Sequence, residues 1–195
     1  SLTVSVDSFI PVIPPVFVKP AVQNRMARFL TPEEHYMFPN DDLMLVGSAE
    51  HALGPMHMDE VFDESDLPIR YAGYSTAFRR EAGSFGKEVR GLNRVHQFEK
   101  VEIIQIVHPD KSDDTLNEMV AHVENLLISL GLQYRILRLC GGDMGFASAI
   151  TYDFEVYSAA QEKWLEVSSV SNFNNYQTYR MKCRFKDQEI GRAHV

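Results

Sequence analysis

The sequence predicts an α+β fold: a mainly antiparallel β-sheet flanked by helices. Three observations support this class, namely many short strand-like runs, one strongly periodic helix, and hairpin-length links between the strand-like runs. The chain has 195 residues, 45% of them hydrophobic. That length and composition suit one domain with a sizeable hydrophobic core.

The first half of the chain is expected to contribute strands separated by irregular segments. Residues 1–40 are rich in proline and only weakly periodic, which limits regular strand pairing. Strands are then expected at 43–46, at 71–80 and at 93–108. The last of these becomes more apolar toward its end, as a strand does when it enters a core.

Residues 112–130 form the strongly predicted helix. Its apolar residues recur at spacings of three and four: Leu116, Met119, Val120, Val123, Leu126, Leu127 and Leu130. Ser112 is expected to cap the start of the helix, and Gly131 is expected to end it. Four further strands are expected after it, at 133–139, 150–158, 163–171 and 178–185.

The bulk composition argues against several classes of protein. A formal net charge of -8 disfavours a surface that binds nucleic acid over its whole extent, although it allows a local cationic pocket. The two cysteines, Cys140 and Cys183, have no zinc-binding spacing and favour a reducing, cytoplasmic compartment. No apolar run is long enough to span a membrane, and no signal-peptide pattern is present.

One stretch concentrates positive charge within this acidic chain. Residues 78–102, FRREAGSFGKEVRGLNRVHQFEKVE, hold six cationic side chains and four carboxylates around three glycines. Glycines at these positions allow a loop to turn sharply and to approach a ligand closely. Arginine is the cation best suited to grip phosphate or carboxylate groups with a planar fork.

Strand alternation suggests how these side chains are presented. Side chains point to opposite faces in turn, so Arg94, His96, Phe98, Lys100 and Glu102 are expected on one face of their strand. In the same way, Arg79 and Glu81 are expected to share a face of the preceding strand. A cation, a ring and a carboxylate in a row suit a phosphate, a flat base and an ammonium group. The alternative is a solvated surface hairpin, which has no need of a phenylalanine between its charges.

Residues 78–102 closely resemble motif 2 of class II aminoacyl-tRNA synthetases, in the form that seryl-tRNA synthetases use. Three further stretches agree with this family and occur in its order: GSAEH at 47–51, CGGDMGFASAITYDFEVYSAAQEKWLEVSS at 140–169 and SNFNNYQTYRM at 171–181. The resemblance is strongest over residues 41–185. It implies that residues 1–195 form a partial class II catalytic domain.

The resemblance also implies a reaction and its partners. ATP activates L-serine to seryl-adenylate, and the seryl group then passes to serine tRNA. Such chemistry asks a protein for positioning and charge neutralisation, with Mg²⁺ on the phosphates. The family further implies a homodimer for the full-length protein, a cytoplasmic location and no membrane association.

Individual roles follow from matching this sequence to the family's motifs. Arg79, Arg94 and Glu102 are the expected catalytic residues. Contacts to ATP are expected from Arg79, Arg80, Glu81, Arg94, Phe98, Glu166, Val167, Ser168 and Ser169. Contacts to serine are expected from Ser48, Ala49, Glu50, Arg79 and Glu102. Glu166 and Ser169 are the expected metal ligands.

The resemblance does not extend to two parts of the family. Nothing here is similar to the N-terminal helical arm that holds the tRNA, or to motif 3 with its second ATP-gripping arginine. The sequence is therefore expected to be a fragment or a reduced version of the core. Two alternatives stay open: a non-catalytic synthetase-like paralogue that acts as a binding or regulatory module, and a homologue that loads an amino acid onto a carrier protein.

Overall fold

A computed structural model describes residues 9–29, 32–81, 93–186 and 190–192 of the chain. The strands of these segments form four three-stranded sheets, in the orders β1-β6-β7, β10-β9-β8, β12-β11-β5 and β2-β4-β3. Most strand pairs are antiparallel; β1 with β6 and β11 with β5 are parallel. The predicted α+β class with a mainly antiparallel sheet is confirmed.

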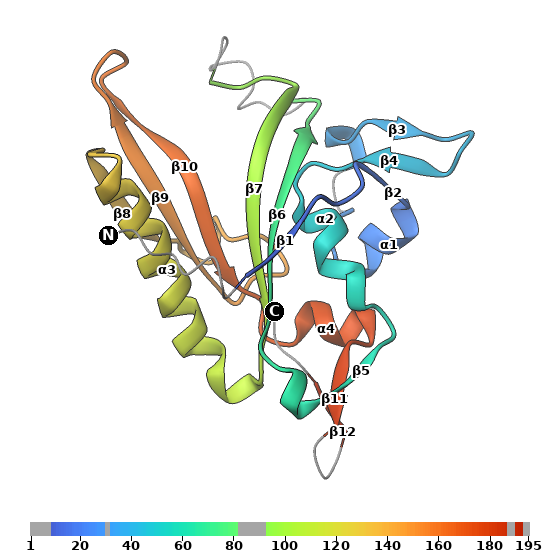
Figure 1. Cartoon of the computed structure of the whole chain (residues 1–195). Helices are drawn as coiled ribbons and strands as arrows, with labels where there is room; N and C mark the ends of the chain where they lie inside the picture. Colours follow the sequence, from blue (N-terminus) through green and yellow to red (C-terminus); the bar gives the residue numbers. More distant parts are fainter. Residues whose placement is uncertain (1–8, 30–31, 82–92, 187–189, 193–195) are drawn as a thin grey trace.

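The elements follow one another as in Figure 1. The strands are β1 (Ile10–Val12), β2 (Phe17–Val18), β3 (Met37–Phe38), β4 (Leu43–Leu45), β5 (Val61–Asp63), β6 (Ile69–Phe78), β7 (Gln97–Ile106), β8 (Tyr134–Arg138), β9 (Ile150–Ser158), β10 (Lys163–Asn172), β11 (Arg184–Lys186) and β12 (Ile190–Arg192). The α-helices are α1 (Pro20–Arg25), α2 (Glu50–Leu53), α3 (Ser112–Ser129) and α4 (Tyr176–Met181). Short 3₁₀ turns are η2 (Pro32–Glu34), η3 (Gly54–His57), η4 (Glu64–Asp66) and η6 (Pro109–Lys111).

The long β6–β7 ribbon runs through the middle of the molecule (Figure 1). Its ladder extends from the pair Ile69 and Ile106 to the pair Phe78 and Gln97. On one side α2 packs against it through a core cluster of Ala49, Leu53, Tyr71 and Ile104. The segment that contains α2 is therefore attached to the ribbon by buried apolar contacts.

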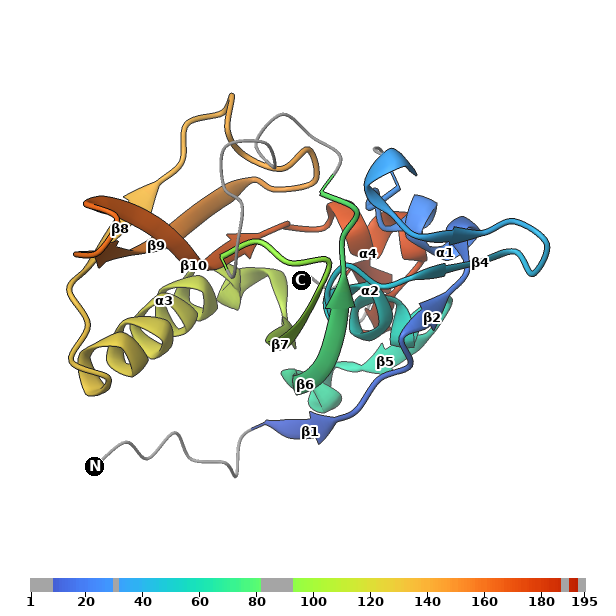
Figure 2. The same ribbon diagram turned by 90° about the horizontal axis from the view of Figure 1, so that it is seen from above.

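The second layer consists of β8, β9 and β10 with α3 lying across one face of them (Figures 1 and 2). The apolar stripe predicted for the helix forms this core: Leu116, Val123 and Leu127 pack on Phe154 and Val170. Burial of such a stripe is what stabilises a helix of this kind. No helix within the described segments is long and apolar enough to cross a membrane.

The ends of α3 confirm one prediction and correct another. Gly131 follows the helix with a φ of +66°, a conformation that glycine adopts without steric cost, so the predicted stop is confirmed. Ser112 is the first helical residue, and Lys111 occupies the capping position without a capping side-chain bond. The hydroxyl of Ser112 instead donates to Oδ1 of Asn172 at the end of β10.

Three predicted strands are wrong in extent or in type. The strand predicted at 71–80 spans 69–78, so Arg79 and Glu81 follow it and do not share one of its faces. Residues 178–185 do not form one strand, because α4 occupies 176–181 and β11 begins only at Arg184. Six residues are too few for helical periodicity to stand out, although the buried Gln177, Thr178 and Met181 lie on one helical face. The strand predicted at 93–108 spans only 97–106, so Arg94 and His96 precede it.

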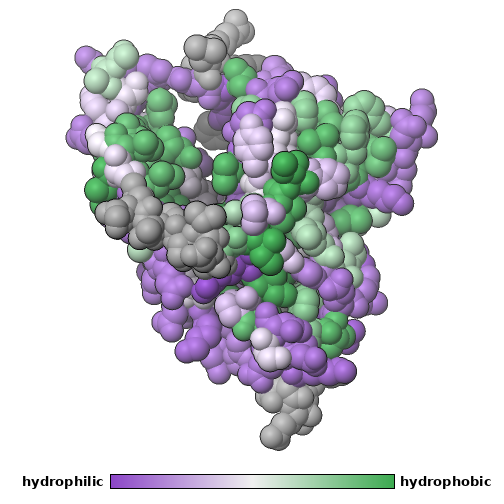
Figure 3. All heavy atoms as spheres, viewed as in Figure 1, coloured by the Kyte–Doolittle hydropathy of each residue, from purple (hydrophilic) through white to green (hydrophobic). Residues whose placement is uncertain are grey.

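The front of the molecule exposes apolar side chains near β1 and β2. Ile13 is 87% exposed, and Ile10 and Phe17 are also well exposed. Figure 3 shows hydrophobic residues gathered down the middle of this face, where β1 lies in Figure 1. A contiguous apolar area of this kind is typical of a surface that another protein covers.

Replacing Phe154 tests the core beneath α3. We expect Phe154→Ala to lower the free energy of unfolding by about 3–5 kcal/mol, because this fully buried ring would leave a cavity. Phe146→Ala is the matched control, since that ring is 72% exposed and its loss should cost less than about 1 kcal/mol. Urea unfolding measures both; equal losses would contradict the assignment of the core.

Candidate active site

A cavity of about 400 Å³ lies where the β6–β7 ribbon faces the β8–β9–β10 layer. Its walls come from the GSAEH segment, β7, α3, β9 and β10. The residues from the predicted site that line it are Ser48, Glu50, Arg79, Glu102, Glu166 and Ser169. Segments far apart in the sequence thus supply one concave site, the usual form of a small-molecule pocket.

Three side chains from two segments form a polar cluster in one wall. The hydroxyl of Ser48 donates to Oε2 of Glu102, and Nζ of Lys100 lies 2.9 Å from the same oxygen. Lys100 also approaches the hydroxyl of Ser48 at 3.4 Å. Lys100 and Glu102 share a face of β7 with Phe98, as strand alternation predicted. Glu102 is thereby an acceptor placed at the cavity wall.

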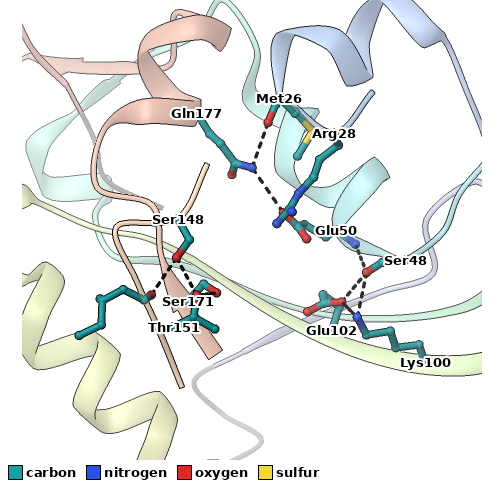
Figure 4. A network of polar contacts seen from close by, with 11 residues as sticks. Met26, Arg28, Ser48, Glu50, Lys100, Glu102, Ser148, Thr151, Ser171 and Gln177 are labelled. Carbon is teal, nitrogen blue, oxygen red and sulfur yellow. Dashed lines mark hydrogen bonds and ion pairs between the residues drawn. The ribbon is translucent and has the colours of Figure 1, made fainter. Parts of the chain in front are cut away.

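Glu50, at the start of α2, forms a second polar cluster. Arg28 donates to Oε1 of Glu50 from Nε at 2.9 Å and from Nη2 at 2.7 Å, and Gln177 reaches the same oxygen at 3.4 Å (Figure 4). Burial alone would raise the pKa of Glu50, but the charge of Arg28 and, more weakly, that of Lys100 hold it below its ordinary value. The carboxylate is therefore ionised at neutral pH.

Arg79 is fixed at the point where β6 ends. Its Nε donates to the carbonyl oxygen of Gly47 at 3.1 Å, and its guanidinium lies 5.3 Å from the centre of the Phe98 ring. The N–H of Gly47 in turn donates to Nδ1 of the buried His51 at 3.2 Å. Backbone and ring contacts together hold the Arg79 side chain, which also lines the cavity.

The rest of the predicted ATP set from this stretch lies outside the lining of the cavity. Nε of Arg94 lies 2.7 Å from Oε2 of Glu81, and the N–H of Arg80 donates to the carbonyl oxygen of Glu34. Phe98, Arg80, Glu81 and Arg94 are not among the residues that line the cavity. The glycine-containing loop at 82–92 lies outside the described residues, so its predicted contacts stay predictions.

A β-bulge in β10 brings Glu166 and Ser169 into the same cavity. The pairing with β9 shifts between Glu166 and Ser168, so Val167 is an extra residue in the strand. In a regular strand, residues three apart point to opposite faces. Because of the bulge, Glu166 and Ser169 both line the cavity, whereas Val167 and Ser168 do not.

Glu166 lies in an environment that favours a nearby cation. Burial and the neighbouring carboxylate of Asp153 both raise the pKa of Glu166. A divalent cation would relieve that repulsion, and carboxylate and hydroxyl oxygens are suitable ligands for Mg²⁺. Among the described residues no group of three or more His, Cys, Asp or Glu side chains could hold a metal by itself.

Ala49 differs from its neighbours in the predicted serine-binding triplet. It is fully buried and packs with Leu53 and Tyr71 in the core. Its side chain therefore fixes the position of the segment, while Ser48 and Glu50 face the cavity.

Sequence reasoning missed two residues of the site. Arg28 lines the cavity although it belongs to the weakly periodic first forty residues. Gln177, which bonds to Glu50, lies within the stretch 171–181 that resembles the family, but it was given no role. No local pattern marks Arg28, because its partner Glu50 lies 22 residues further along the chain. Lys100 was placed on the correct face but was given no role.

Comparison with known proteins identifies the family. The family model for the tRNA synthetase class II core domain (G, H, P, S and T) matches residues 36–195. The chain belongs to this family. The matched region contains every site residue predicted from the sequence, whereas Arg28 lies before its first residue.

Individual relatives of this class II core agree with the motif resemblance. The chain is 52% identical over 151 residues to a serine–tRNA ligase of Methylacidiphilum infernorum and 51% identical over 151 residues to one of Salinibacter ruber. Each match covers 77% of this chain but only 36% and 35% of the relative. The class II core thus spans about a third of the length of these curated relatives.

Solved structures give the same result for the fold. The crystal structure of seryl-tRNA synthetase from Pyrococcus horikoshii complexed with ATP matches with a TM-score of 0.92 and 38% identity, over 96% of this chain and 43% of that one. A cytoplasmic serine–tRNA ligase from Naegleria fowleri in complex with AMP matches with a TM-score of 0.89, 30% identity and coverage of 97% and 47%. The resemblance to seryl-tRNA synthetases is confirmed.

The protonation of His51 makes the stability of this core depend on pH. Burial lowers the pKa of His51 to about 4, from a reference value of 6.5. As pH falls below 6.5 the unfolded chain binds a proton that the folded chain refuses, so stability is lost between pH 6.5 and about 4. At about pH 5 the loss should be about 2 kcal/mol relative to pH 7.

His51→Asn isolates this contribution, because asparagine does not titrate and its Oδ1 can still accept from Gly47. We expect the free energy of unfolding, measured with urea, to fall from pH 7 to about pH 5 by about 2 kcal/mol more in the wild type than in the variant. Two pH profiles that run parallel would contradict a buried, neutral His51.

Proposed function

We propose that this class II core catalyses ATP-dependent activation of L-serine to seryl-adenylate, followed by transfer of the seryl group to serine tRNA. The observation that carries the proposal is one cavity lined by Ser48, Glu50, Arg79 and Glu102 on one side and by Glu166 and Ser169 on the other. The serine–tRNA ligases among the relatives support the same reaction.

The amino-acid end of the cavity suits a small molecule with an ammonium group and a hydroxyl. Glu102 already accepts from an ammonium group, Nζ of Lys100, at 2.9 Å, so a substrate ammonium is a chemical match for it. Ser48 and the ionised Glu50 add a hydroxyl and a carboxylate beside it. Polar groups at fixed positions give strong selection for a substrate that satisfies them.

The phosphate end requires positive charge and orientation, and no protein nucleophile. In the proposed reaction the serine carboxylate attacks the α-phosphate of ATP and pyrophosphate leaves. Arg79 is held by Gly47 and stacked beside Phe98, so its charge is already oriented before substrate binds. Arg94 and Glu81 would contact ATP from the adjacent loop, and Phe98 would stack on the adenine.

Glu166 and Ser169 would hold Mg²⁺ together with oxygen atoms of the phosphates. The metal would neutralise phosphate charge during transfer. Arg80, Val167 and Ser168 are proposed to contact ATP and Ala49 to contact serine through backbone groups. A cytoplasmic location and a homodimer complete the proposal. The exposed apolar residues around Ile10, Ile13 and Phe17 support a protein partner on that face.

Arg79→Ala tests the proposed chemistry directly. We expect it to lower serine-dependent exchange of pyrophosphate into ATP by about 10²–10³-fold, because the transition state loses an oriented charge. Arg135→Ala is the matched control: Arg135 stacks on Trp164 and does not line the cavity, so exchange should be unchanged. Absence of serine-dependent exchange in the wild-type full-length protein would overturn the proposal.

Glu166→Gln tests the proposed metal site. The substitution keeps the size of the side chain but removes its charge, so the Mg²⁺ concentration for half-maximal exchange should rise about tenfold. The KM for serine should stay within about twofold, because the proposed serine contacts are on the opposite wall. An unchanged Mg²⁺ dependence would remove Glu166 from the metal site.

A further inference from the structure

Arg28 reaches the cavity from a segment that the family model does not match. That segment follows α1, which ends at Arg25, and the matched region starts at residue 36. Even so, Arg28 lines the cavity and makes a two-pronged ion pair with Glu50. This ion pair is partly buried, and such a pair needs good geometry and further hydrogen bonds to be favourable.

The backbone around Arg28 is held in place by buried amide side chains. Nε2 of Gln177 donates to the carbonyl oxygen of Met26 at 3.2 Å, and Nε2 of Gln23 donates to that of His51 at 2.6 Å. The guanidinium of Arg28 also lies 5.1 Å from the centre of the Phe173 ring. The arginine is thus held by Glu50 on one side, as Figure 4 shows, and by the Phe173 ring on the other.

The contacts to Glu50 are all made to one of its two oxygens. Oε1 accepts from Nε and Nη2 of Arg28 and from Gln177. Within the described residues Oε2 has no hydrogen-bond partner, and it is not among the buried polar atoms left without one. Since Glu50 lines the cavity, Oε2 is the oxygen that a ligand can reach.

We infer that Arg28 is a positioning residue for the amino-acid pocket: it keeps Glu50 ionised and occupies Oε1, so that Oε2 accepts a hydrogen bond from the substrate. The inference rests on the proposed function, because it names the substrate as a small amino acid with a hydroxyl or an ammonium donor. Arg28, which lies outside the recognised motifs, would thus help to select the substrate through its effect on Glu50.

Electrostatics around Glu50 supports this role. Burial alone would raise the pKa of the carboxyl group; the charge of Arg28 is the largest influence that opposes burial, and the charge of Lys100 is a smaller one. The carboxylate of Glu50, together with that of Glu102, raises the pKa of Arg28 and so favours its charged form. Without the guanidinium, the remaining charges oppose burial less effectively. Glu50 would then take up a proton nearer to neutral pH and Oε2 would lose acceptor strength.

The test measures the pH dependence of the KM for serine in the exchange reaction of the full-length protein. We expect Arg28→Gln to raise this KM about tenfold near pH 7, with a KM for ATP within about twofold. The defect should shrink as pH rises above 7, because Glu50 then ionises without help from the guanidinium. In Arg28→Gln combined with Glu50→Gln, this dependence on pH should disappear.

Two further variants separate charge from structure. Arg28→Lys keeps the charge and should keep the wild-type pH profile; a profile like that of Arg28→Gln would overturn the inference. Arg25→Gln is the matched control, because Arg25 pairs with the exposed Asp59 and does not line the cavity. Circular dichroism and thermal unfolding check that each variant folds.

The outcomes distinguish the two proposals. Wild-type protein without serine-dependent exchange overturns the proposed function and this inference with it. If the wild-type protein shows exchange, but Arg28→Gln has the same KM for serine as Arg25→Gln, the inference alone is overturned. A raised KM for serine that does not change with pH also overturns it, because loss of packing would then suffice as the explanation.

Discussion

The antiparallel ladder between β6 and β7 is the constraint on which the site depends. Each strand has ten residues, and their register pairs Gly73 with Glu102. Ile106, at the end of β7, is part of the core. Lys100 and Glu102 precede it in the same strand and pair with each other. A slip of one residue would turn both charges away from the cavity and the apolar residues out of the core.

Charges of both signs are brought together in this cavity rather than one sign alone. Lys100 neutralises Glu102, Arg28 neutralises Glu50, and Arg79 lies against a backbone carbonyl. Paired charges can be held away from water at a tolerable cost in free energy, whereas isolated ones cannot. A chain that is acidic overall can therefore gather positive charge in one cavity without a basic surface, as the anionic nucleotide of the proposed reaction would require.

The sequence supported the strands, the long helix and one face of the site, and the reasons are local. Alternation placed Phe98, Lys100 and Glu102 together, and apolar spacing defined α3. The helices α1, α2 and α4 were missed because six, four and six residues show too little periodicity. Arg28 was missed for another reason: its contacts arise only when distant segments fold together, and neither spacing nor composition records them.

Glu166 and Ser169 came from the resemblance, and alternation alone would have separated them. Their shared direction depends on the one additional residue that β10 contains relative to β9. Which side chains of β10 face the cavity therefore depends on the number of residues between them, because side chains alternate between the two faces of a strand. Deletion of Val167 would turn the side chains on one side of the bulge to the opposite face of the strand. Substitution of Val167 would leave the bulge in place and should therefore disturb the wall far less than its deletion.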